Sequence, residues 1–462
     1  MIRKEIFYTG LTIIVLFFLT TTSFSEPVVL DWDAAWDYAL ERNEGLAEAK
    51  DEVVRSHHRV GEAWASALPT VSFTGAYQHY FMVPSVIFNL PEEMNIDPST
   101  GQSMGPLRLK TQMQAENNII GNIELQQPLY IGGKIGLGLR LAKQYQELTE
   151  LNVKVSRQDL RVELISIFYG AIVADEAVKL SHEVLEQIEA YFKQVNDMYN
   201  QGLVSEYDLI RAKVQIATVR PMIIEAEMNR DLAYKALKNL IGMDVDQEIT
   251  IKGKLQLSDS IEMGYTEANT LAMNERVEFQ QLDLQKKLLE GQEEAERRNI
   301  YWPNLFAGLK WETMAQSEDY KVNKYEFLSG IGGSVALQVP LFDGWRSHHR
   351  VQQARVSIRN VQRYKSQLER GVKMQTFQAM QNLEKAIEDL KAANETLELA
   401  EKGYRIAEVR YSSGVGTQLE VLDAHRIVSS SKVAVLSAIY SQKVARAAFD
   451  RAVGLHIQTD QE

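Results

Sequence analysis

Apolar residues recur at helical spacing through two long stretches of the chain. In both stretches the apolar positions step by three and four residues, which is the spacing of a coiled-coil seam. The first seam consists of Leu185, Ile188, Phe192, Val195 and Tyr199. The second consists of Leu383, Ile387, Leu390, Asn394 and Leu397. We therefore predict two helices of about 65 residues each, beginning near Gly133 and Gly344.

Glycine-containing turns follow both seams and predict that each long helix folds back on itself. Gly202 lies in the first turn, and Gly414 and Gly416 lie in the second. Return helices are expected over about 205–241 and 417–453, and shorter helices over about 31–66 and 267–299. The predicted fold class is therefore mainly α.

Four shorter segments alternate between apolar and polar positions, and they predict a β portion. They cover about 70–81, 119–126, 305–313 and 331–339. Segments of this length with one apolar face are typical of the strands of a transmembrane β-barrel, although a water-soluble antiparallel sheet with one buried face would alternate in the same way. Aromatic residues gather at the segment ends, as in an interfacial belt: Tyr130, Tyr301, Trp302, Phe342 and Trp345. Four strands are too few to close a membrane barrel, so a barrel would require an oligomer.

The amino terminus has the layout of an export signal. Arg3 and Lys4 precede an apolar stretch from Ile6 to Leu19, and the small residues Ser23 and Ser25 follow. This order predicts a signal peptide over 1–25. The alternative is a membrane anchor, but the apolar stretch is short for a helical span.

Composition removes several classes of function. The formal net charge of −12 argues against a nucleic-acid-binding protein, whose affinity rests on clustered Lys and Arg. The 462-residue chain contains no cysteine, which excludes disulfides, thiolate metal sites and a lipidated amino-terminal Cys. No nucleophile elbow, phosphate-binding loop or metalloprotease spacing occurs, so we expect neither an enzyme nor a bound cofactor.

Two motifs occur twice, and both pairs have the same offset. The segment 126–132 recurs as 338–344, and the turn segment 199–208 recurs as 411–420, in each case 212 residues later. A constant offset without insertion or deletion indicates an internal duplication.

The duplicated motifs, together with the opening helix at 36–43, resemble the outer-membrane efflux protein family of TolC-like channels. The resemblance covers about 27–456. It implies a homotrimeric channel-tunnel in which each protomer adds its strands to one outer-membrane barrel above a helical periplasmic tunnel. It also implies outer-membrane lipid, a periplasmic adaptor protein and an inner-membrane transporter as partners. The expected function is the exit duct of a tripartite efflux or type I secretion system. A passive porin and a structural coiled-coil scaffold of the envelope are the alternatives.

The resemblance and the duplication together divide the chain into segments. A first repeat at 26–242 contains a β-hairpin at about 70–127, whose loop at about 82–116 would be extracellular. An equatorial segment at 243–266 follows. A second repeat at 267–456 contains a β-hairpin at about 304–340, and a tail covers 457–462.

The resemblance also assigns roles at the two turns. Asp423 and Glu420 match positions that place acidic side chains in the pore constriction, where threefold symmetry would make rings of carboxylates able to bind divalent ions. The alternative is that both are solvated charges favoured at a helix start. Tyr411 and Asp208 match positions that join neighbouring helix pairs at the closed tip. Gly416 replaces a basic residue of the family, so the resemblance does not extend to an arginine latch.

Six turn residues are candidates for contact with the adaptor: Gly202, Leu203, Ser205, Gly414, Val415 and Thr417. A glycine in such a turn can also serve only to adopt positive φ, and the two roles are compatible.

Two pairs of adjacent histidines were considered as metal ligands: His57, His58, His348 and His349. Neighbouring residues on a helix point about 100° apart, which is poor geometry for chelation, so we predict no metal site.

Overall fold

The computed structural model describes residues 28–91, 94–112, 114–253, 263–321 and 325–455. The predicted signal peptide and the tail at 457–462 lie outside these residues, and so does 254–262 of the predicted equatorial segment. The chain divides into two compact units. The first comprises Met1–Glu52, Glu150–Gln281 and Lys365–Glu462, and the second comprises Val53–Thr149 and Leu282–Tyr364.

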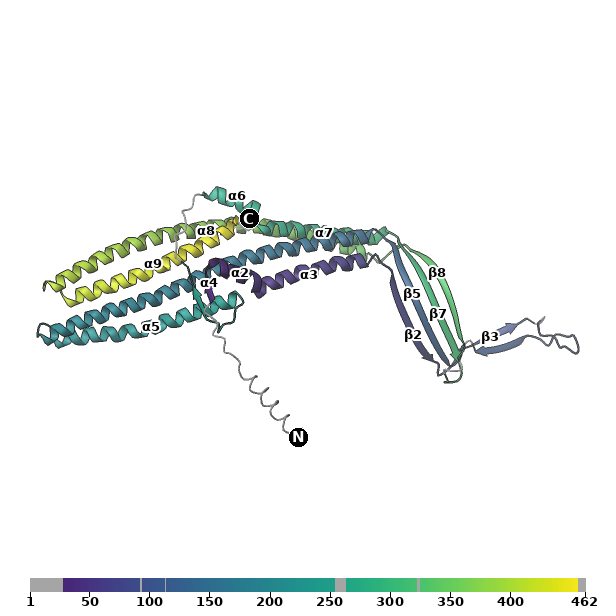
Figure 1. Ribbon diagram of the computed structural model, residues 1–462. Coiled ribbons are helices and arrows are strands. Elements are labelled where there is room, and N and C mark those ends of the chain that lie inside the picture. The colour runs from purple at the N-terminus through teal and green to yellow at the C-terminus, as the bar shows by residue number, and fades with distance from the viewer. Residues whose placement is uncertain (1–27, 92–93, 113, 254–262, 322–324, 456–462) are drawn as a thin grey trace, which may run out of the picture. The chain divides into compact units, whose positions relative to one another are not determined.

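The two predicted long helices are confirmed (Figure 1). α4 (Lys134–Asn200) and α8 (Arg346–Ser412) each contain 67 residues. The return helices are α5 (Glu206–Leu240) and α9 (Gln418–Val453), within two residues of the expected bounds. Within the described residues, no helix is both long and apolar enough to cross a membrane.

The two predicted shorter helices are interrupted, which corrects the expectation of continuous helices over 31–66 and 267–299. The first is divided into α2 (Trp32–Arg42) and α3 (Glu44–Ala65), and the second into α6 (Tyr265–Glu275) and α7 (Val277–Tyr301). At the first break Asn43 has an extended backbone, and its Oδ1 accepts a hydrogen bond from the Leu46 N–H at 2.9 Å. Its Nδ2 donates to the Leu240 carbonyl at 2.9 Å. A break of one residue barely disturbs the apolar periodicity, so the pattern alone does not reveal it.

A buried ion-pair network surrounds the second break. The Arg276 guanidinium contacts the Glu278 carboxylate at 2.8 Å, and Arg451 of α9 contacts it at 3.0 Å. Arg451 also pairs with Asp159 of α4 at 2.8 Å. Burial opposes ionisation of Glu278, but the hydrogen bond from Arg276 and the charge of Arg451 outweigh it and lower the pKa of Glu278 to about 2.

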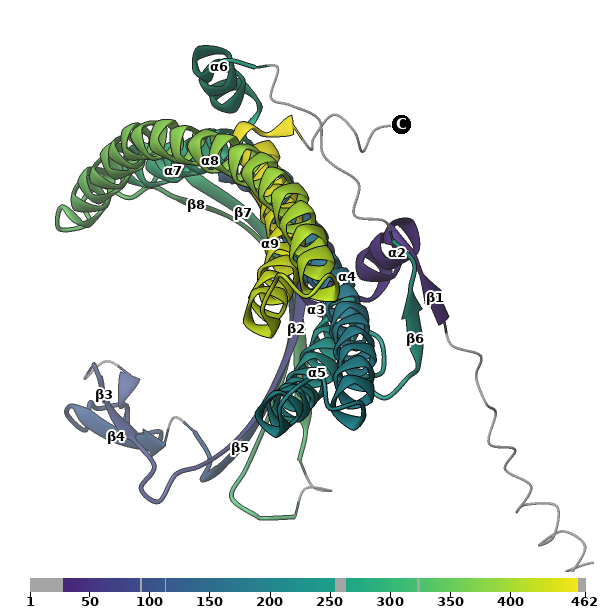
Figure 2. The same cartoon turned by 90° about the vertical axis from the view of Figure 1, so that its left-hand side faces the viewer.

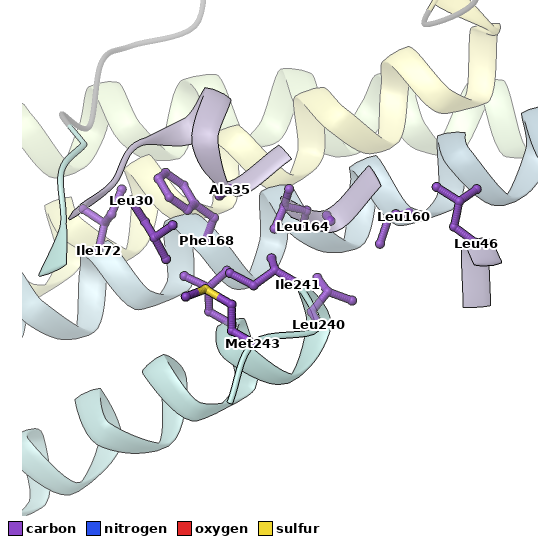
Figure 3. Packing of buried hydrophobic residues seen from close by; sticks show 12 residues of the cluster. Leu30, Ala35, Leu46, Leu160, Leu164, Phe168, Ile172, Leu240, Ile241 and Met243 are labelled. Carbon is purple, nitrogen blue, oxygen red and sulfur yellow. The ribbon is translucent and has the colours of Figure 1, made fainter. Parts of the chain in front are cut away.

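The largest buried cluster lies where α2 packs on α4 and on the end of α5 (Figure 3). Phe168, Leu164 and Ile241 are almost fully buried there. Two short strands outside our prediction, β1 (Val28–Leu30) and β6 (Ile249–Ile251), pair in parallel beside this cluster. Leu30 of β1 is fully buried in the cluster, so burial of apolar surface attaches this small sheet to the helices.

The two long helices and the two return helices lie side by side in the order α5, α4, α9, α8 (Figure 2). α4 and α9 are adjacent, because the Ser166 and Tyr440 hydroxyls lie 3.0 Å apart. α5 packs on α4 through Ile188 and Val219, and α8 packs on α9 in a separate cluster that contains Leu383. α5 and α8 are therefore the outer helices of the row within one chain.

The four predicted strands form one antiparallel sheet in the order β2-β5-β7-β8. Their bounds are β2 (Thr70–His79), β5 (Asn117–Ile131), β7 (Asn304–Ser317) and β8 (Phe327–Gln338). β5 and β7 are longer than the expected segments. Each repeat contributes one outer strand and one inner strand, so the sheet has the same layout as the helices.

The strand register gathers the predicted apolar positions on one face of the sheet. Phe73, Ile123, Trp311 and Ile331 stand opposite one another in a single row across the strands. The neighbouring row on the other face consists of Ser72, Glu124, Lys310 and Gly332. Directly opposed residues point to the same face, so the sheet has one apolar side and one mainly polar side.

The segment at 82–116, predicted as a loop, contains a second hairpin. β3 (Ser85–Leu90) pairs with β4 (Leu107–Gln112) in antiparallel register. Val86, Phe88 and Leu90 alternate with polar residues here, which is the pattern of a half-buried strand. The prediction of a plain loop between the two barrel strands is therefore corrected to a loop that contains a hairpin.

Candidate gate at the helix turns

The first turn closes with a reciprocal helix cap. Gly202 has φ +74°, and its N–H donates to the Tyr199 carbonyl at 2.9 Å. Ser205 Oγ accepts from the Asp208 N–H at 3.2 Å, and an Asp208 carboxylate oxygen accepts from the Ser205 N–H at 3.1 Å. This capping box satisfies donors at the start of α5 and holds the Asp208 carboxylate at the turn.

The second turn repeats this backbone with different side chains. Gly414 has φ +76°, and its N–H donates to the Tyr411 carbonyl at 3.0 Å. Thr417 Oγ1 accepts from the Glu420 N–H at 3.3 Å. The Glu420 carboxylate lies 3.5 Å from the Arg410 guanidinium instead of returning to the cap. The duplicated turns thus share a fold while presenting different charges.

Open space surrounds the two turn glycines. A Cβ atom built on Gly202 or Gly414 meets no heavy atom of the described chain within 4 Å. Their positive φ explains the glycines, and packing within the chain does not. Leu203 and Val415 beside them are 65% and 72% exposed, so each turn presents an accessible apolar side chain.

The two predicted pore carboxylates are exposed and each has an arginine neighbour. Asp423 Oδ1 accepts from Arg426 Nη2 at 3.0 Å within α9. Glu420 has Arg410 beside it, as described above. Exposed pairs of this kind contribute little to stability, so both carboxylates stay accessible to ions.

Tyr411 and Asp208 come together in a cluster that includes two residues our sequence analysis missed. The rings of Tyr191 and Tyr411 lie 6.3 Å apart, and Gln418 Nε2 donates to the Asp208 carbonyl at 3.2 Å. Burial, assisted by Tyr411, raises the pKa of the Tyr191 hydroxyl. These four residues, the tip cluster, join α4 and α5 of the first repeat to α8 and α9 of the second. Gln418 is 7% exposed, and a glutamine one residue after a helix cap gives no sequence sign of such burial.

A histidine, His425 of α9, lies at the contact between α4 and α9, further from the turns than the tip cluster. His425 Nε2 lies 2.7 Å from Gln187 Oε1, and its ring is 5.6 Å from that of Tyr404. Lys432 pairs with Glu183 nearby at 3.4 Å. Burial, followed by the charge of Lys432, lowers the pKa of His425 below its usual range, so the imidazole is neutral at pH 7.

The paired histidines do not assemble into a metal centre. The rings of His57 and His58 are 6.1 Å apart and those of His348 and His349 are 5.8 Å apart, in both cases nearly edge to face. Across the described parts of the chain, no three or more His, Asp or Glu side chains converge as metal ligands.

A charged cavity of about 600 Å³ lies beside the predicted equatorial segment. Its lining includes Arg230, Lys235, Asp175 and Glu248. Lys238, which is nearly buried, donates to the carbonyls of Val245 and Gln247 and thereby holds the segment after α5 in place. The lining contains three cationic side chains and four carboxylates, so its charges largely compensate one another.

Comparison with known proteins places the chain among efflux channels. The model of the family described as "Outer membrane efflux protein" matches residues 36–243 and 304–455. The cobalt-zinc-cadmium resistance protein CzcC of Cupriavidus metallidurans is 23% identical over 336 residues, which are 71% of this chain and 75% of CzcC. Crystal structures of the outer membrane channel CmeC of Campylobacter jejuni and of the outer membrane protein VceC of Vibrio cholerae have the same fold. The TM-score is 0.68 for CmeC, at 16% identity over 91% of this chain and 85% of CmeC. For VceC it is 0.66, at 15% identity over 91% of this chain and 95% of VceC.

Proposed function

The chain belongs to the outer membrane efflux protein family, and we propose that three copies form the exit duct of a tripartite efflux or type I secretion system. In this proposal an adaptor opens the duct at its helix turns, and an inner-membrane transporter drives the export. As a member of this family the chain is an outer-membrane efflux channel and not an enzyme. The main support for assembly into a trimer is that the sheet and the row of helices both have exposed outer elements. These are the strands β2 and β8 and the helices α5 and α8.

The outer strands of the sheet support a trimer. β2 and β8 each pair on one side only among the described strands, and nearly all of their residues are exposed. An open edge with exposed apolar side chains is a template for pairing with another chain. Pairing of β2 with β8 of the next copy would close a barrel, which four strands alone cannot do.

The outer helices support the same arrangement. α5 exposes two groups of large apolar side chains: Tyr207, Ile210 and Val214 at steps of three and four, and Ile224 and Met228 at a step of four. Near its carboxyl end α8 exposes Leu399, Ile406 and Val409 at steps of seven and three. A seam of this type normally packs against another helix, so α5 of one copy would meet α8 of the next.

The two faces of the sheet fit lipid outside and water inside. The row that contains Phe73 and Trp311 suits contact with acyl chains, and the row that contains Glu124 and Lys310 suits a hydrated lumen. In the proposed barrel the ion pair between Lys310 and Glu312, at 2.7 Å, would lie at the lumen.

The tip cluster and the exposed carboxylates support a gate at the turns. Threefold symmetry would place three copies of Asp423 and of Glu420 around the axis, where they would favour cations and could bind divalent ions. Tyr411, Asp208, Tyr191 and Gln418 would hold the two helix pairs of each protomer together in the closed state. Opening would require these contacts to separate.

The turn surfaces support docking of an adaptor. Gly202, Leu203 and Ser205 on one turn and Gly414, Val415 and Thr417 on the other form two similar surfaces 212 residues apart in the sequence. Three copies would present six such surfaces, in two related types. An adaptor that binds there could pull on both helix pairs at once.

Single-channel conductance of the purified mature protein in planar bilayers tests the gate. We expect a cation-selective pore that millimolar divalent cation blocks, and an Asp423→Asn variant whose divalent affinity is lower by about tenfold, or about 1.4 kcal/mol. Gln418→Ala should raise the open probability, since it removes the contact with Asp208. Asp389→Asn, in an exposed pair with Lys385 on α8, is the matched control and should behave like wild type.

The outcomes separate the parts of the proposal. A pore whose block is indifferent to Asp423 would keep the duct and remove Asp423 from the gate. Transport that continues in cells lacking every adaptor would favour a passive porin. Absence of conductance even for Gln418→Ala would favour an envelope scaffold.

A further inference from the structure

The β3–β4 hairpin has two chemically distinct faces. Its register places Val86, Phe88 and Leu90 on the same side as Thr111, Leu109 and Leu107. We call this side the apolar face of the hairpin. The opposite side carries Ser85, Ile87, Asn89, Arg108, Lys110 and Gln112. Five of the six residues on the first face are apolar, whereas only Ile87 is apolar on the second.

The described part of the chain covers the apolar face only in part, since Val86 and Leu90 are half-buried while the rest of the face is exposed. Phe88 is 51% exposed and Leu109 is 46% exposed, and the four buried clusters contain no residue of either strand. Met94, Ile96 and Met104 add further exposed apolar surface near the hairpin tip. A two-stranded ribbon is marginally stable in water unless one face is buried. The hairpin therefore has the composition of an element that packs against something outside the chain.

The hairpin leaves the large sheet between the end of β2 and the start of β5, where side-chain hydrogen bonds join the two strands (Figure 1). Asn117, which is fully buried at the start of β5, accepts a hydrogen bond from the Tyr77 hydroxyl at 2.6 Å. Its Oδ1 also lies 2.9 Å from His79 Nδ1, and the centroid of the tilted Tyr320 ring is 5.5 Å from that of His79. β3 begins six residues after His79, so the hairpin leaves the sheet at a rim of aromatic side chains. Such rims lie at the headgroup level of membrane proteins.

Charge distinguishes a lipid surface from other partners. Arg108 and Lys110 are the charged residues of the two strands, both are exposed, and both lie opposite the apolar face. The polar face is therefore positively charged in a chain whose net charge is −12. An element that is apolar on one side and basic on the other is typical of segments that lie flat in a membrane interface. Long basic side chains can then reach lipid phosphates.

We propose that the β3–β4 hairpin lies in the outer leaflet of the outer membrane as an interfacial anchor. Its apolar face would contact the upper acyl chains, and Arg108 and Lys110 would contact the phosphates of anionic headgroups. The inference rests on the proposed function only in that the large sheet spans the outer membrane. It adds a lipid-binding surface outside the barrel wall, next to the extracellular mouth.

The natural absence of cysteine allows a direct test with single-cysteine variants of the full mature chain. Phe88→Cys and Leu109→Cys probe the apolar face, and Asn89→Cys and Gln112→Cys are controls on the opposite face that leave Arg108 and Lys110 in place. Each is labelled with an environment-sensitive fluorophore and reconstituted in phosphatidylethanolamine vesicles with or without phosphatidylglycerol. Lipids with a nitroxide on the acyl chain, and aqueous iodide, serve as the two quenchers.

The proposal expects a blue-shifted emission and nitroxide quenching at the first two positions, and iodide quenching at the two controls. Arg108→Ser combined with Lys110→Ser should weaken nitroxide quenching of the Phe88→Cys label in phosphatidylglycerol vesicles and leave it unchanged in neutral vesicles. Equal iodide quenching on both faces would overturn the proposal. So would efficient bismaleimide cross-linking of Phe88→Cys between protomers, because a second copy would then cover the face.

The oligomeric state and conductance of the same samples separate this inference from the proposed function. Conducting trimers without nitroxide quenching would reject the hairpin as an anchor and leave the duct intact. Nitroxide quenching in a preparation that neither trimerises nor conducts would support the anchor and count against the duct.

Discussion

At the scale of single residues, two glycines in equivalent positions of the repeats illustrate how backbone geometry selects a residue. Gly242 and Gly454 end the return helices with φ of +68° and +79°. A Cβ on Gly242 would stand 2.6 Å from the Arg42 carbonyl oxygen, and one on Gly454 would stand 3.1 Å from Glu275 Cβ. In each repeat the glycine thus lets the helix end approach the break between the two shorter helices.

We expect Gly242→Ala to destabilise the protein by about 2–4 kcal/mol, because it combines a left-handed backbone with a steric clash. Thermal unfolding followed by circular dichroism in detergent would measure the effect. Gly61→Ala, at an open and exposed position within α3, is the control and should stabilise by about 0.5–1 kcal/mol. Equal unfolding temperatures for Gly242→Ala and wild type would contradict the clash.

At the scale of elements, the seam between α4 and α9 joins the two repeats and contains a titratable side chain. The charged groups around His425 are Lys432, its partner Glu183 and the adjacent Arg426. Gln187 and Tyr404 provide the neutral contacts. The lowered pKa of His425 means that the packed seam disfavours the imidazolium. The unpacked state binds the proton more readily, so the seam loses stability as pH falls through about 6.5.

Acidification from pH 7.5 to pH 5.5 should therefore raise the open probability of the channel in planar bilayers, because protonation of His425 weakens the contact between α4 and α9. His425→Gln should remove most of this response, since glutamine can keep the hydrogen bond without titrating. His182→Gln is the control, because His182 pairs with Glu227 on the exposed contact between α4 and α5 and should leave the response unchanged. The same pH response in both variants would assign the titration to another group.

At the scale of the whole molecule, the outer strands and the outer helices are the elements through which the proposed trimer would assemble. In the sheet and in the row of helices, the inner elements have neighbours on both sides within one chain. The outer elements β2, β8, α5 and α8 expose apolar side chains. The duplication explains the layout, since each repeat supplies one inner and one outer element to each layer. Assembly would bury these exposed apolar side chains between copies, in contacts like those between the helices and strands within one chain.

Substituting the exposed seam of α5 should prevent assembly without unfolding the protomer. Ile210→Glu combined with Val214→Glu removes two apolar side chains worth about 1.5–3 kcal/mol each when buried. We expect monomers by light scattering in detergent and wild-type helicity by circular dichroism. Lys213→Glu, at an exposed polar position next to Val214, is the control and should remain trimeric. Persistence of the trimer in the double variant would mean that α5 does not form the interface between copies.

Much of the fold followed from local patterns in the sequence. The steps of Leu185, Ile188 and Phe192 predicted α4, and the alternation around Phe73 and Trp311 predicted β2 and β7. The tip cluster was predicted in part: Tyr411 and Asp208 were identified by resemblance, but Tyr191 and Gln418 were missed. Their contacts join residues about 200 positions apart, and no local pattern encodes such a pairing.

The duplication, the lengths of the helices and the apolar face of each strand can all be predicted from the sequence, because they depend on periodicities of a few residues repeated over long stretches. The tertiary structure decided where Asn43 and Arg276 interrupt helices, how β1 pairs with β6, and that Gln418 reaches the backbone of Asp208. Asn43, Arg276 and Gln418 bond to groups far along the chain, and β1 pairs through its backbone with a strand that is equally distant in the sequence. Only the packed arrangement of the helices brings those partners within hydrogen-bonding distance.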